Sequence, residues 1–388
     1  MKICFVRQMP YPYTIGGGTT YMNDLISALL KKGQDVSVIT SRPSKNDERI
    51  KNDKPDGVKI TYVGLRHRKF GKGFLPLDLI YRFFFELIFM ISSFFAIKRL
   101  KPDVIHTQTL VAESFLLSIL NVPFVATVYG LPEGLKELWS KRKNKTAVLL
   151  SYLYKWVGNF CARKAKLMII ATTKETQDYY KRLGKTILLG SGITLSKFNL
   201  HSKKKKKLYL SLSRLSEQKG LSYLFEALQI LDNKGVKLEF NIVGDGDKDY
   251  VAMLKEKSGK LKNIKVNFLG WITGRKKLEI YRAAEVYVLP SIFEPFGITV
   301  LEAMASECAI IASDCEGPKQ VVKSGFGEII NYKDEKKRAE NLALAIQKSL
   351  RWNVAKMGKK AREEVKKYDY DIIVNKYLEI YKQNKINR

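Results

Sequence analysis

The sequence is poor in cysteine, and no two cysteines stand at a functional spacing. Its 388 residues contain Cys4, Cys161, Cys308 and Cys315, each isolated from the others along the chain. None has a neighbour at the spacing of zinc ligands, and a chain of this length does not depend on a disulfide framework. These absences exclude the small disulfide-rich secreted proteins, and we expect a protein of the reducing cytoplasm.

Long hydrophobic runs are also missing. The first residues, MKICFVRQMP, lack the long apolar core of a signal peptide. The most apolar run, FFFELIFMISSFFAI over residues 83–97, is too short for a membrane span and contains Glu86. Asp78, Arg82 and Glu86 recur every four residues, so we expect a helix with one charged stripe in water. The apolar remainder fits either a core helix or a helix that lies on a membrane surface.

Acidic residues are scarce relative to basic ones, and the net charge is +31. Residues 1–200 hold 32 Lys and Arg against 14 Asp and Glu, whereas the rest of the chain holds 37 against 24. The excess is densest over 136–145 and 163–166. Four aromatic residues accompany these segments, namely Trp139, Tyr152, Tyr154 and Trp156. Cations with interfacial aromatics suit an anionic lipid surface, and a solvated basic face without a partner is the alternative.

Nucleic-acid binding is a competing explanation for the positive charge. The sequence has no zinc-finger spacing, no ribonucleoprotein aromatic motif and no clear helix-turn-helix. We therefore expect no specific nucleic-acid partner.

Short β-rich runs alternate with helical periods along the whole chain, whose hydrophobic content of 45% indicates a folded protein. The runs are KICFV, VSVIT, KITYV, DVIH, PFVAT, LMIIA and TILL, followed by LYLSL, EFNIV, VNFL, VYVLP and AIIAS. This alternation predicts the α/β class, with two doubly wound Rossmann-like domains of parallel strands. Five consecutive lysines at 203–207 cannot lie in a core. We therefore predict domains over 1–200 and 201–366 and a terminal helix over 367–388.

Ligands of open parallel sheets bind beyond the C-terminal ends of the strands, and two such domains facing each other form a cleft there. After the first strand, Gly16, Gly17 and Gly18 lead into a helix. Glycines let backbone N–H groups approach an anion at a helix N-terminus. A plain glycine-rich turn is the alternative.

The first two strands of the second domain are followed by further candidates. Arg214 ends the first of these strands, and Lys219 precedes a helix five residues later. Two cations at a helix start suit a diphosphate, and solvated surface charge is the alternative. Gly244, after the next strand, allows either a tight turn or the close approach of a ring or phosphate.

The stretch SIFEPFGITVLEAM, residues 291–304, holds two carboxylates eight residues apart. The proline and glycine between them exclude a continuous helix, so we expect Glu294 in a loop at a strand end. Glu302 is expected in the first turn of a helix that begins near Thr299, where the two residues fit a capping box. Alternatively, both carboxylates accept hydrogen bonds from sugar hydroxyls, and the amides of Gly297 to Thr299 face a phosphate.

Together these loops resemble the family four, or group 1, glycosyltransferases of the GT-B fold. The resemblance covers nearly the whole chain and is densest over 208–330, through LSLSRLSEQKG, NIVGDGD and PSIFEPFGITVLEAM. In the first half, GGGTTYMNDL, KPDVIHTQ, PFVATVYG and LGSGITLSKF follow in the family's order. The combination is far more specific than any single motif.

The resemblance implies a retaining enzyme that moves a hexose from a nucleotide diphosphate sugar, without a metal or another cofactor. Arg214 and Lys219 would hold the diphosphate, Glu294 the donor sugar and Glu302 the ribose. The remaining donor-side residues would be Gly16, Gly17, Gly18, Gly244, Phe296, Gly297, Ile298 and Thr299. The first domain would bind the acceptor, and the terminal helix would return to that domain.

The resemblance also implies a front-face substitution, in which the leaving phosphate helps to accept the acceptor's proton. A double-displacement nucleophile is not evident, because Glu294 and Glu302 would be engaged with hydroxyls. Tyr129, which stands where the family often has histidine, keeps a hydrogen-bonding group but leaves that role open. His106 is retained on the acceptor side, although a packed structural histidine is the alternative. Gln108 replaces a frequent second histidine.

We expect a saccharide or lipid-linked saccharide acceptor, bound at the inner face of the cell membrane. A soluble acceptor, as in sucrose- or trehalose-like products, is one alternative, and a sugar-phosphate enzyme of similar fold is another. A non-catalytic membrane or nucleic-acid binder is the alternative from a different class. The donor fits UDP- or GDP-hexose, since no residue stands out as a reader of the base.

Overall fold

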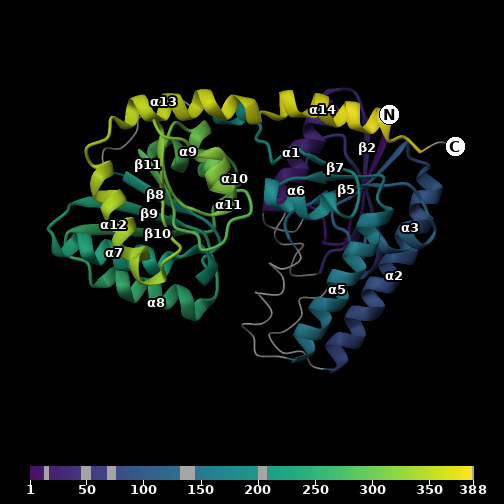
Figure 1. Ribbon diagram of the computed structural model, residues 1–388, viewed down its shortest axis with the longest axis horizontal. Coiled ribbons are helices and arrows are strands. Elements are labelled where there is room, and N and C mark those ends of the chain that lie inside the picture. The colour runs from purple at the N-terminus through teal and green to yellow at the C-terminus, as the bar shows by residue number, and fades with distance from the viewer. Residues whose placement is uncertain (13–16, 45–53, 68–75, 132–144, 200–207, 387–388) are drawn as a thin grey trace. The chain divides into compact units, whose positions relative to one another are not determined.

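The computed structural model describes residues 1–12, 17–44, 54–67, 76–131, 145–199 and 208–386 (Figure 1). The chain forms two compact units. Unit 1 contains Met1–Ser191 and Tyr370–Arg388, and unit 2 contains Gly192–Asp369. The domain boundary expected from the lysine run falls at 200/201, in a segment outside the described residues, whereas the units divide at 191/192 and again at 369/370.

Unit 1 is built on parallel strands in the order β3-β2-β1-β4-β5-β6-β7. They are β1 (Lys2–Arg7), β2 (Asp35–Arg42), β3 (Lys59–Arg66), β4 (Val104–Thr107), β5 (Val125–Val128), β6 (Leu167–Ile170) and β7 (Thr186–Leu188). The helices are α1 (Gly17–Lys31), α2 (Pro76–Leu100), α3 (Phe115–Ile119), α5 (Lys145–Lys164), α6 (Lys174–Lys181) and the C-terminal α14 (Tyr370–Gln383). Each strand predicted in this half is present.

The central strands of unit 1 form where short apolar runs are buried on both faces. In β1, every residue after Lys2 is buried, without the polar alternation of a half-exposed strand. That pattern is typical of a parallel sheet covered by helices on both sides. The strand order reverses between β1 and β4, so the carboxyl ends of these two strands mark the position where such sheets bind ligands.

Unit 2 repeats this arrangement with parallel strands in the order β10-β9-β8-β11-β12-β13. They are β8 (Leu208–Leu212), β9 (Leu238–Val243), β10 (Ile264–Gly270), β11 (Val286–Leu289), β12 (Ala309–Ser313) and β13 (Gly327–Ile330). The helices are α7 (Leu221–Asn233), α8 (Lys248–Gly259), α9 (Gly274–Ala283), α10 (Ile298–Ala305), α11 (Glu316–Val321), α12 (Arg338–Ser349) and α13 (Val354–Val365). Here the order reverses between β8 and β11.

The edge strand β13 was not predicted from the sequence. Its four residues, GEII, begin with glycine, which is depleted in strands. The structure explains the glycine, because a Cβ on Gly327 would lie 2.8 Å from the Ile310 carbonyl oxygen of β12. The missing side chain therefore lets the edge strand approach its neighbour.

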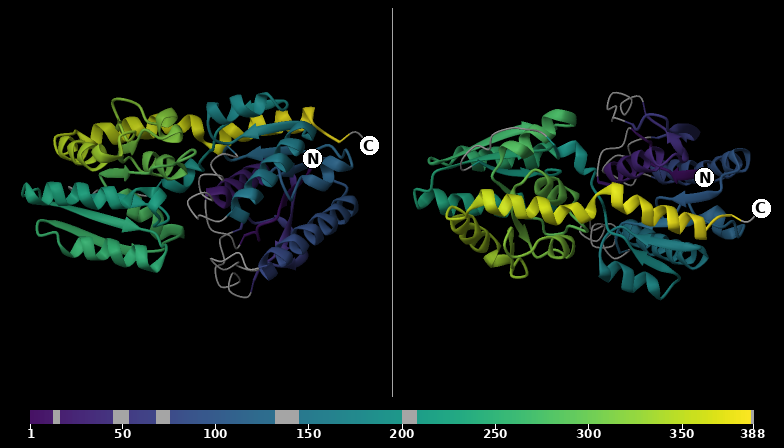
Figure 2. Two further views of the ribbon diagram at one scale, coloured as in Figure 1. Left: turned by 60° about the horizontal axis from the view of Figure 1, so that its bottom comes forward. Right: turned by 90° about the horizontal axis from the view of Figure 1, so that it is seen from above.

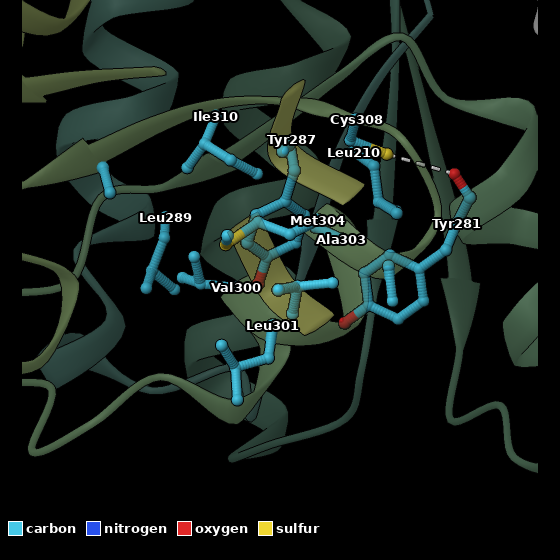
Figure 3. Packing of buried hydrophobic residues seen from close by; sticks show 14 of the residues in the cluster. Leu210, Tyr281, Tyr287, Leu289, Val300, Leu301, Ala303, Met304, Cys308 and Ile310 are labelled. Carbon is cyan, nitrogen blue, oxygen red and sulfur yellow. Dashed lines mark hydrogen bonds between the residues drawn. The ribbon is translucent and has the colours of Figure 1, made fainter. Parts of the chain in front are cut away.

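Alternate residues of the unit 2 strands face two separate clusters. Figure 3 shows one of them, in which strand residues pack against the buried side of α10: Leu210, Tyr287, Leu289 and Ile310 against Val300, Leu301 and Met304. The residues between them, including Tyr209, Val288 and Ile311, pack with α7 and α12 on the other face. The sheet is thus buried on both of its faces, and α10 is held by its packing against one of them. This packing fixes the N-terminus of α10, which follows β11 in the chain.

Helix α2 does not turn its charged stripe to water. Arg82 Nε donates to Glu86 Oε1 at 3.1 Å, and the Tyr154 hydroxyl of α5 donates to the same oxygen. The Arg82 guanidinium also lies 5.0 Å from the centre of the Tyr154 ring. The prediction of a water-facing stripe is therefore wrong for Arg82 and Glu86, because α5 supplies their partner. The side chain of Asp78 lies outside the described ones.

Helix α2 exposes several large apolar side chains, and most of them are aromatic. Phe83 is 65% exposed, Phe84 50%, Ile91 43% and Phe95 64%. The neighbouring α5, which runs beside α2 in Figure 1, exposes Tyr152, Leu153 and Trp156. Among the described helices, none combines the length and the apolar content that crossing a bilayer requires.

The C-terminal helix α14, yellow in Figure 2, packs against α1 within unit 1. The Tyr370 hydroxyl donates to the Tyr21 carbonyl oxygen at 3.3 Å, and the hydroxyls of Tyr21 and Tyr377 share a hydrogen bond. Tyr370, Tyr377 and Tyr381 are buried. The last helix is thus part of the core of unit 1.

Candidate functional site

A half-buried ion pair joins the loop after β8 to the loop after β11. Lys219 Nζ lies 2.6 Å from Glu294 Oε2, and the two side chains are 21% and 14% exposed. Lys219 ends a short turn, Glu217–Lys219, and Gly220 follows with φ 64°. A Cβ on Gly220 would lie 1.8 Å from the Pro290 carbonyl oxygen, so only glycine lets the two loops approach this closely.

Arg214 lies in the same loop, directly after β8, but its guanidinium remains unpaired. The side chain is exposed, and it makes no hydrogen bond or ion pair with any described residue. The structure therefore brings Lys219 to Glu294 and leaves Arg214 as a free cation at the carboxyl end of β8.

Helix α10 begins at Ile298, four residues after Glu294. Gly297 precedes the helix with φ 90°, and no side chain caps the helix start. The first backbone N–H groups of a helix have no intrahelical acceptor, so those of Ile298 and Thr299 are available to an anion. A Cβ on Gly297 would lie 3.5 Å from Glu294 Cγ, which places the carboxylate residue beside this helix start.

Glu302 lies in the second turn of α10, not in the first. Because Gly297 is the N-cap and Ile298 the first helical residue, Thr299 is inside the helix and the predicted capping box is wrong. The Glu302 side chain is buried instead. Its Oε1 accepts from Lys277 Nζ at 2.5 Å, and its Oε2 accepts from the Tyr281 hydroxyl at 2.9 Å.

Lys277 and Tyr281 were missed by the sequence analysis. They lie four residues apart on α9 and so share one face of that helix. This spacing was the only feature of the sequence that could have indicated them as partners of a buried group. Burial, followed by the charge of Glu302, raises the pKa of Tyr281 well above its ordinary value, so its hydroxyl stays protonated and donates. A carboxylate has about four acceptor sites, of which Lys277 and Tyr281 occupy one on each Glu302 oxygen. Figure 3 shows Tyr281 within the cluster that holds α10.

Two other predicted donor residues, Gly244 and Phe296, have structural roles within unit 2. Gly244 has φ 141°, and a Cβ there would lie 1.8 Å from the Ser213 carbonyl oxygen. The missing side chain of Gly244 therefore lets the loop after β8 approach closely, and no ligand is needed to explain this glycine. Phe296 is buried with its ring against Tyr368, so its side chain belongs to the core.

In unit 1, the predicted glycine loop leads into α1. Gly17 and Gly18 are its first residues, and Gly16 lies outside the described residues. Arg7, at the end of β1, holds this helix start. Its guanidinium donates to the Gly18 carbonyl oxygen at 3.3 Å and to Thr19 Oγ1 at 2.9 Å.

Tyr129 follows β5 and reaches the end of β4. Its hydroxyl donates to Gln108 Oε1 at 2.5 Å, and its ring meets that of Tyr21 edge-on at 5.4 Å. Burial, with a smaller effect of Tyr21, raises the pKa of Tyr129 well above its ordinary value. The side chain therefore acts as a neutral hydrogen-bonding group.

His106 is buried completely, with both ring nitrogens engaged. Nδ1 bonds to the Tyr381 hydroxyl at 2.7 Å, and Nε2 bonds to Thr127 Oγ1 at 2.6 Å. Burial lowers the pKa of His106 to about 3. The expectation that His106 contacts an acceptor does not fit this geometry, because both ring nitrogens are already hydrogen-bonded within unit 1. The packed structural histidine is the alternative that the contacts support.

Two models of known families cover the two halves of the chain. The model described as Glycosyltransferase Family 4 matches residues 15–189, and Glycosyl transferases group 1 matches residues 193–367. The chain belongs to this glycosyltransferase family. The recognition from sequence motifs is therefore confirmed, and it rested mainly on the loops of unit 2.

Curated relatives agree with the family. An uncharacterized glycosyltransferase of Methanocaldococcus jannaschii is 34% identical over 181 residues, a match that spans 45% of each chain. A Campylobacter jejuni enzyme is 25% identical over 92% of this chain and 93% of its own length. That relative is N,N'-diacetylbacillosaminyl-diphospho-undecaprenol alpha-1,3-N-acetylgalactosaminyltransferase.

Solved structures show the same fold. Sucrose-phosphate synthase from Thermosynechococcus elongatus superposes with a TM-score of 0.76 over 98% of both chains, at 22% identity. The predicted fold, with two Rossmann-like domains of the GT-B type, is confirmed by this likeness and by the two parallel sheets.

Proposed function

We propose that this glycosyltransferase is a retaining hexosyltransferase that uses a UDP- or GDP-sugar. Its acceptor would be a lipid-linked or surface glycan at the cytoplasmic face of the membrane. The observation that carries the proposal is the group at the carboxyl edge of the unit 2 sheet. There Lys219 pairs with Glu294, the buried Glu302 keeps free acceptor sites, and the uncapped N-terminus of α10 lies beside them.

Each part of this group fits one part of a nucleotide sugar. The free cation Arg214, together with Lys219 and the amides of α10, would hold the diphosphate. The remaining acceptor sites of Glu302 suit the two vicinal hydroxyls of a ribose, and Glu294 would accept from hydroxyls of the donor sugar. Lys219 lies between the residues for the diphosphate and the residue for the donor sugar. When the donor binds, Lys219 would exchange its Glu294 partner for a phosphate oxygen.

The chemistry would proceed on one face of the sugar. The bond from C1 to the diphosphate oxygen breaks, a bond from C1 to the acceptor oxygen forms on the same face, and the leaving phosphate takes the acceptor's proton. Arg214, Lys219 and the α10 amides would stabilise the charge that develops on the leaving group. Glu294 is assigned to hydroxyl binding and not to nucleophilic attack, because its carboxylate would be engaged with hydroxyls of the donor sugar.

A membrane-bound acceptor is supported by two observations. The Campylobacter relative, which matches over nearly its whole length, acts on a diphospho-undecaprenol substrate. In this chain, α2 and α5 expose large aromatic side chains, and the net charge is +31. Aromatic and cationic surfaces favour anionic bilayers.

A soluble acceptor is the second candidate. The fold shared with a sucrose-phosphate synthase extends over 98% of the chain, so nothing in the overall architecture requires a lipid. Acceptor identity depends on unit 1 side chains that the fold does not specify.

The first experiment is a thermal-shift screen with UDP, GDP and ADP and their hexoses, since a ligand that binds the folded state raises apparent stability. One donor should stabilise the protein and be hydrolysed slowly, and Glu294→Ala should abolish turnover of that donor. NMR of the product formed with a membrane lipid extract should show the donor's anomeric configuration. If no nucleotide sugar is bound or turned over, the proposed function is wrong; an inverted product would refute retention alone.

A further inference from the structure

A second polar group lies at the carboxyl edge of the unit 1 sheet, where the strand order reverses. Gln8 directly follows β1, Gln108 directly follows β4, and Glu113 lies in the loop between β4 and α3. This is the position where open parallel sheets bind ligands. Neither Gln8 nor Glu113 was a candidate in the sequence analysis.

Hydrogen bonds hold these side chains in place. The Gln8 backbone N–H donates to Glu113 Oε1 at 2.6 Å, and the Tyr129 hydroxyl donates to Gln108 Oε1 at 2.5 Å. Glu113 is 4% exposed and Gln108 is 3% exposed. Arg7 lies close enough to Glu113 for their charges to interact, so the residues form one cluster.

Three buried atoms of this cluster have no hydrogen-bond partner among the described residues: Glu113 Oε2, Gln8 Nε2 and Gln108 Nε2. Native proteins leave few buried polar atoms unpaired, because each one loses its bonds to water on folding. A cluster of three such atoms at a ligand-binding edge indicates that something absent from the protein itself completes their bonds.

The chemistry of the three atoms selects the ligand. Glu113 Oε2 accepts hydrogen bonds, and the two amide nitrogens donate them. A hydroxyl group both donates and accepts, so neighbouring sugar hydroxyls can satisfy all three atoms. A phosphate is mainly an acceptor and would leave Glu113 Oε2 unpaired, and a cation is disfavoured by Arg7 and by the amide donors.

We propose that Glu113, Gln108 and Gln8 form a binding site for the hydroxyl groups of the acceptor saccharide. This inference rests on the proposed function, because it assumes that the chain transfers a sugar. It assigns acceptor recognition to the loop after β4 and to the end of β1, in place of the buried His106. Tyr129 positions Gln108 through its hydrogen bond.

Glu113→Gln is the decisive variant, because it keeps the size of the side chain and replaces one carboxylate oxygen by an amide donor. Glu175→Gln, which removes an exposed carboxylate of α6 in the same unit, is the matched control. Methyl glycosides of glucose, galactose, mannose and their N-acetylamino forms serve as acceptor probes. Their binding is measured by saturation-transfer NMR, independently of turnover.

We expect the wild type to bind at least one of these glycosides at millimolar concentration. Glu113→Gln should weaken that binding at least tenfold, while the KM for the nucleotide sugar and its hydrolysis in water change less than twofold. Glu175→Gln should resemble the wild type. Gln8→Met, tested alongside with melting temperature as the check on folding, should weaken the same glycoside.

The possible failures are distinguishable. If the wild type neither binds nor hydrolyses any nucleotide sugar, the proposed function itself fails. If donor turnover is intact but no glycoside binds, or if both variants bind it as the wild type does, the hydroxyl site is refuted. A change in melting temperature without a change in glycoside binding would mean that the cluster holds only water, and would also refute it.

Discussion

At the scale of single residues, the carboxylates of this protein are defined by their partners. Glu294 is paired with Lys219, Glu302 with Lys277 and Tyr281, and Glu113 with the Gln8 backbone. In each case the carboxylate and its partner come from different elements. Under the proposed function, these acceptors are oriented before the substrate arrives.

Lys277→Met tests the orientation of Glu302. Removing the amine leaves one buried carboxylate oxygen unpaired, so we expect a loss of about 1–3 kcal/mol in the free energy of unfolding. Urea unfolding measures this loss. Lys276→Met, which removes an exposed amine from the same helix, should change stability by about 0.5 kcal/mol or less.

A double variant makes the test of Lys277 specific. Lys277→Met combined with Glu302→Gln removes the charge together with its partner, and it should recover part of the lost stability. Nucleotide affinity should still be weak in the double variant, because the ribose would lose a carboxylate acceptor. If Lys277→Met is as stable as Lys276→Met, the ion pair does not hold Glu302.

His106 gives the fold a defined pH dependence. Its pKa is about 3 in the folded protein, against an ordinary value of about 6.5 in the unfolded chain. As pH falls below 6.5, the unfolded chain takes up the proton first, so the stabilisation is full above 6.5 and decreases toward pH 3. Its ring contacts are Tyr381, Thr127, Phe5 and Tyr377, none of which carries a charge in this range.

A His106→Gln variant should expose this effect. The variant is less stable than the wild type at pH 7.5, but that deficit should be about 2 kcal/mol smaller at pH 5, where only the wild type bears the cost of a suppressed proton. Urea unfolding of both proteins at the two pH values measures the difference. An equal deficit at both pH values would show that the His106 ring is open to protonation.

Glu113 makes the stability of the fold depend on pH in the opposite direction. Burial raises its pKa to about 7, while Gln8, Arg7 and Thr109 lower it by smaller amounts. The folded protein therefore binds this proton more tightly than the unfolded chain does, and stability decreases as pH rises from about 4.5 to 7. Between about pH 4.5 and 6.5 the effects of His106 and Glu113 oppose each other in the wild type, so the difference between wild type and His106→Gln isolates the effect of His106.

At the scale of elements, close contact between loops decides where the donor-site residues lie. Gly220 lets the start of α7 approach the end of β11, and Gly244 lets the loops after β8 and β9 meet. Neither glycine needs a ligand to explain it. Their effect on function is indirect, because they place Lys219 and Arg214 at the carboxyl edge of the sheet.

Gly220→Ala should break this arrangement. Its Cβ would overlap the Pro290 carbonyl oxygen, and φ 64° already disfavours alanine, so we expect a loss of at least about 2 kcal/mol. The thermal shift with the best nucleotide should also shrink, because Lys219 is adjacent. Gly235→Ala is the control, since φ there is 70° with open space around the new atom. Equal losses in both variants would mean that only backbone strain matters and not the contact with β11.

At the scale of the whole molecule, charge and exposed aromatics predict two separable contributions to membrane binding. The net charge of +31 should draw the protein to anionic vesicles at low salt and lose its effect at high salt. The apolar contribution of α2 should persist in salt. Binding to phosphatidylglycerol vesicles and to phosphatidylcholine vesicles, measured by flotation at both salt levels, separates the two.

The double variant Phe84→Ser and Phe95→Ser tests the apolar contribution. Both rings are at least half exposed, so the variant should fold normally and bind anionic vesicles several-fold more weakly at high salt. Leu344→Ser with Ile372→Ser removes comparable exposed side chains elsewhere and should bind as the wild type does. No binding of the wild type to either vesicle would remove the membrane from the proposed function.

Much of the fold could be predicted because its signals are local. A run such as KICFV is typical of a strand that is buried on both faces of a covered parallel sheet, and the alternation of such runs with helical periods predicts two doubly wound parallel sheets. The short edge strand β13 was missed because its residues have low strand propensity, and pairing with β12 overrides that propensity.

The sequence by itself determined the class of fold, the family and the loops that carry function, because these depend on periodicity, turn residues and motif spacing along the chain. Only the tertiary structure decided which side chains meet: Lys219 with Glu294, Lys277 with Glu302, and His106 with Tyr381. Each of these contacts joins residues 25 to 275 positions apart in the chain, and the contact of Lys219 with Glu294 also depends on the glycine at position 220. Spacing along the chain carries no information about such contacts, because the direction of a side chain is set by what packs around it.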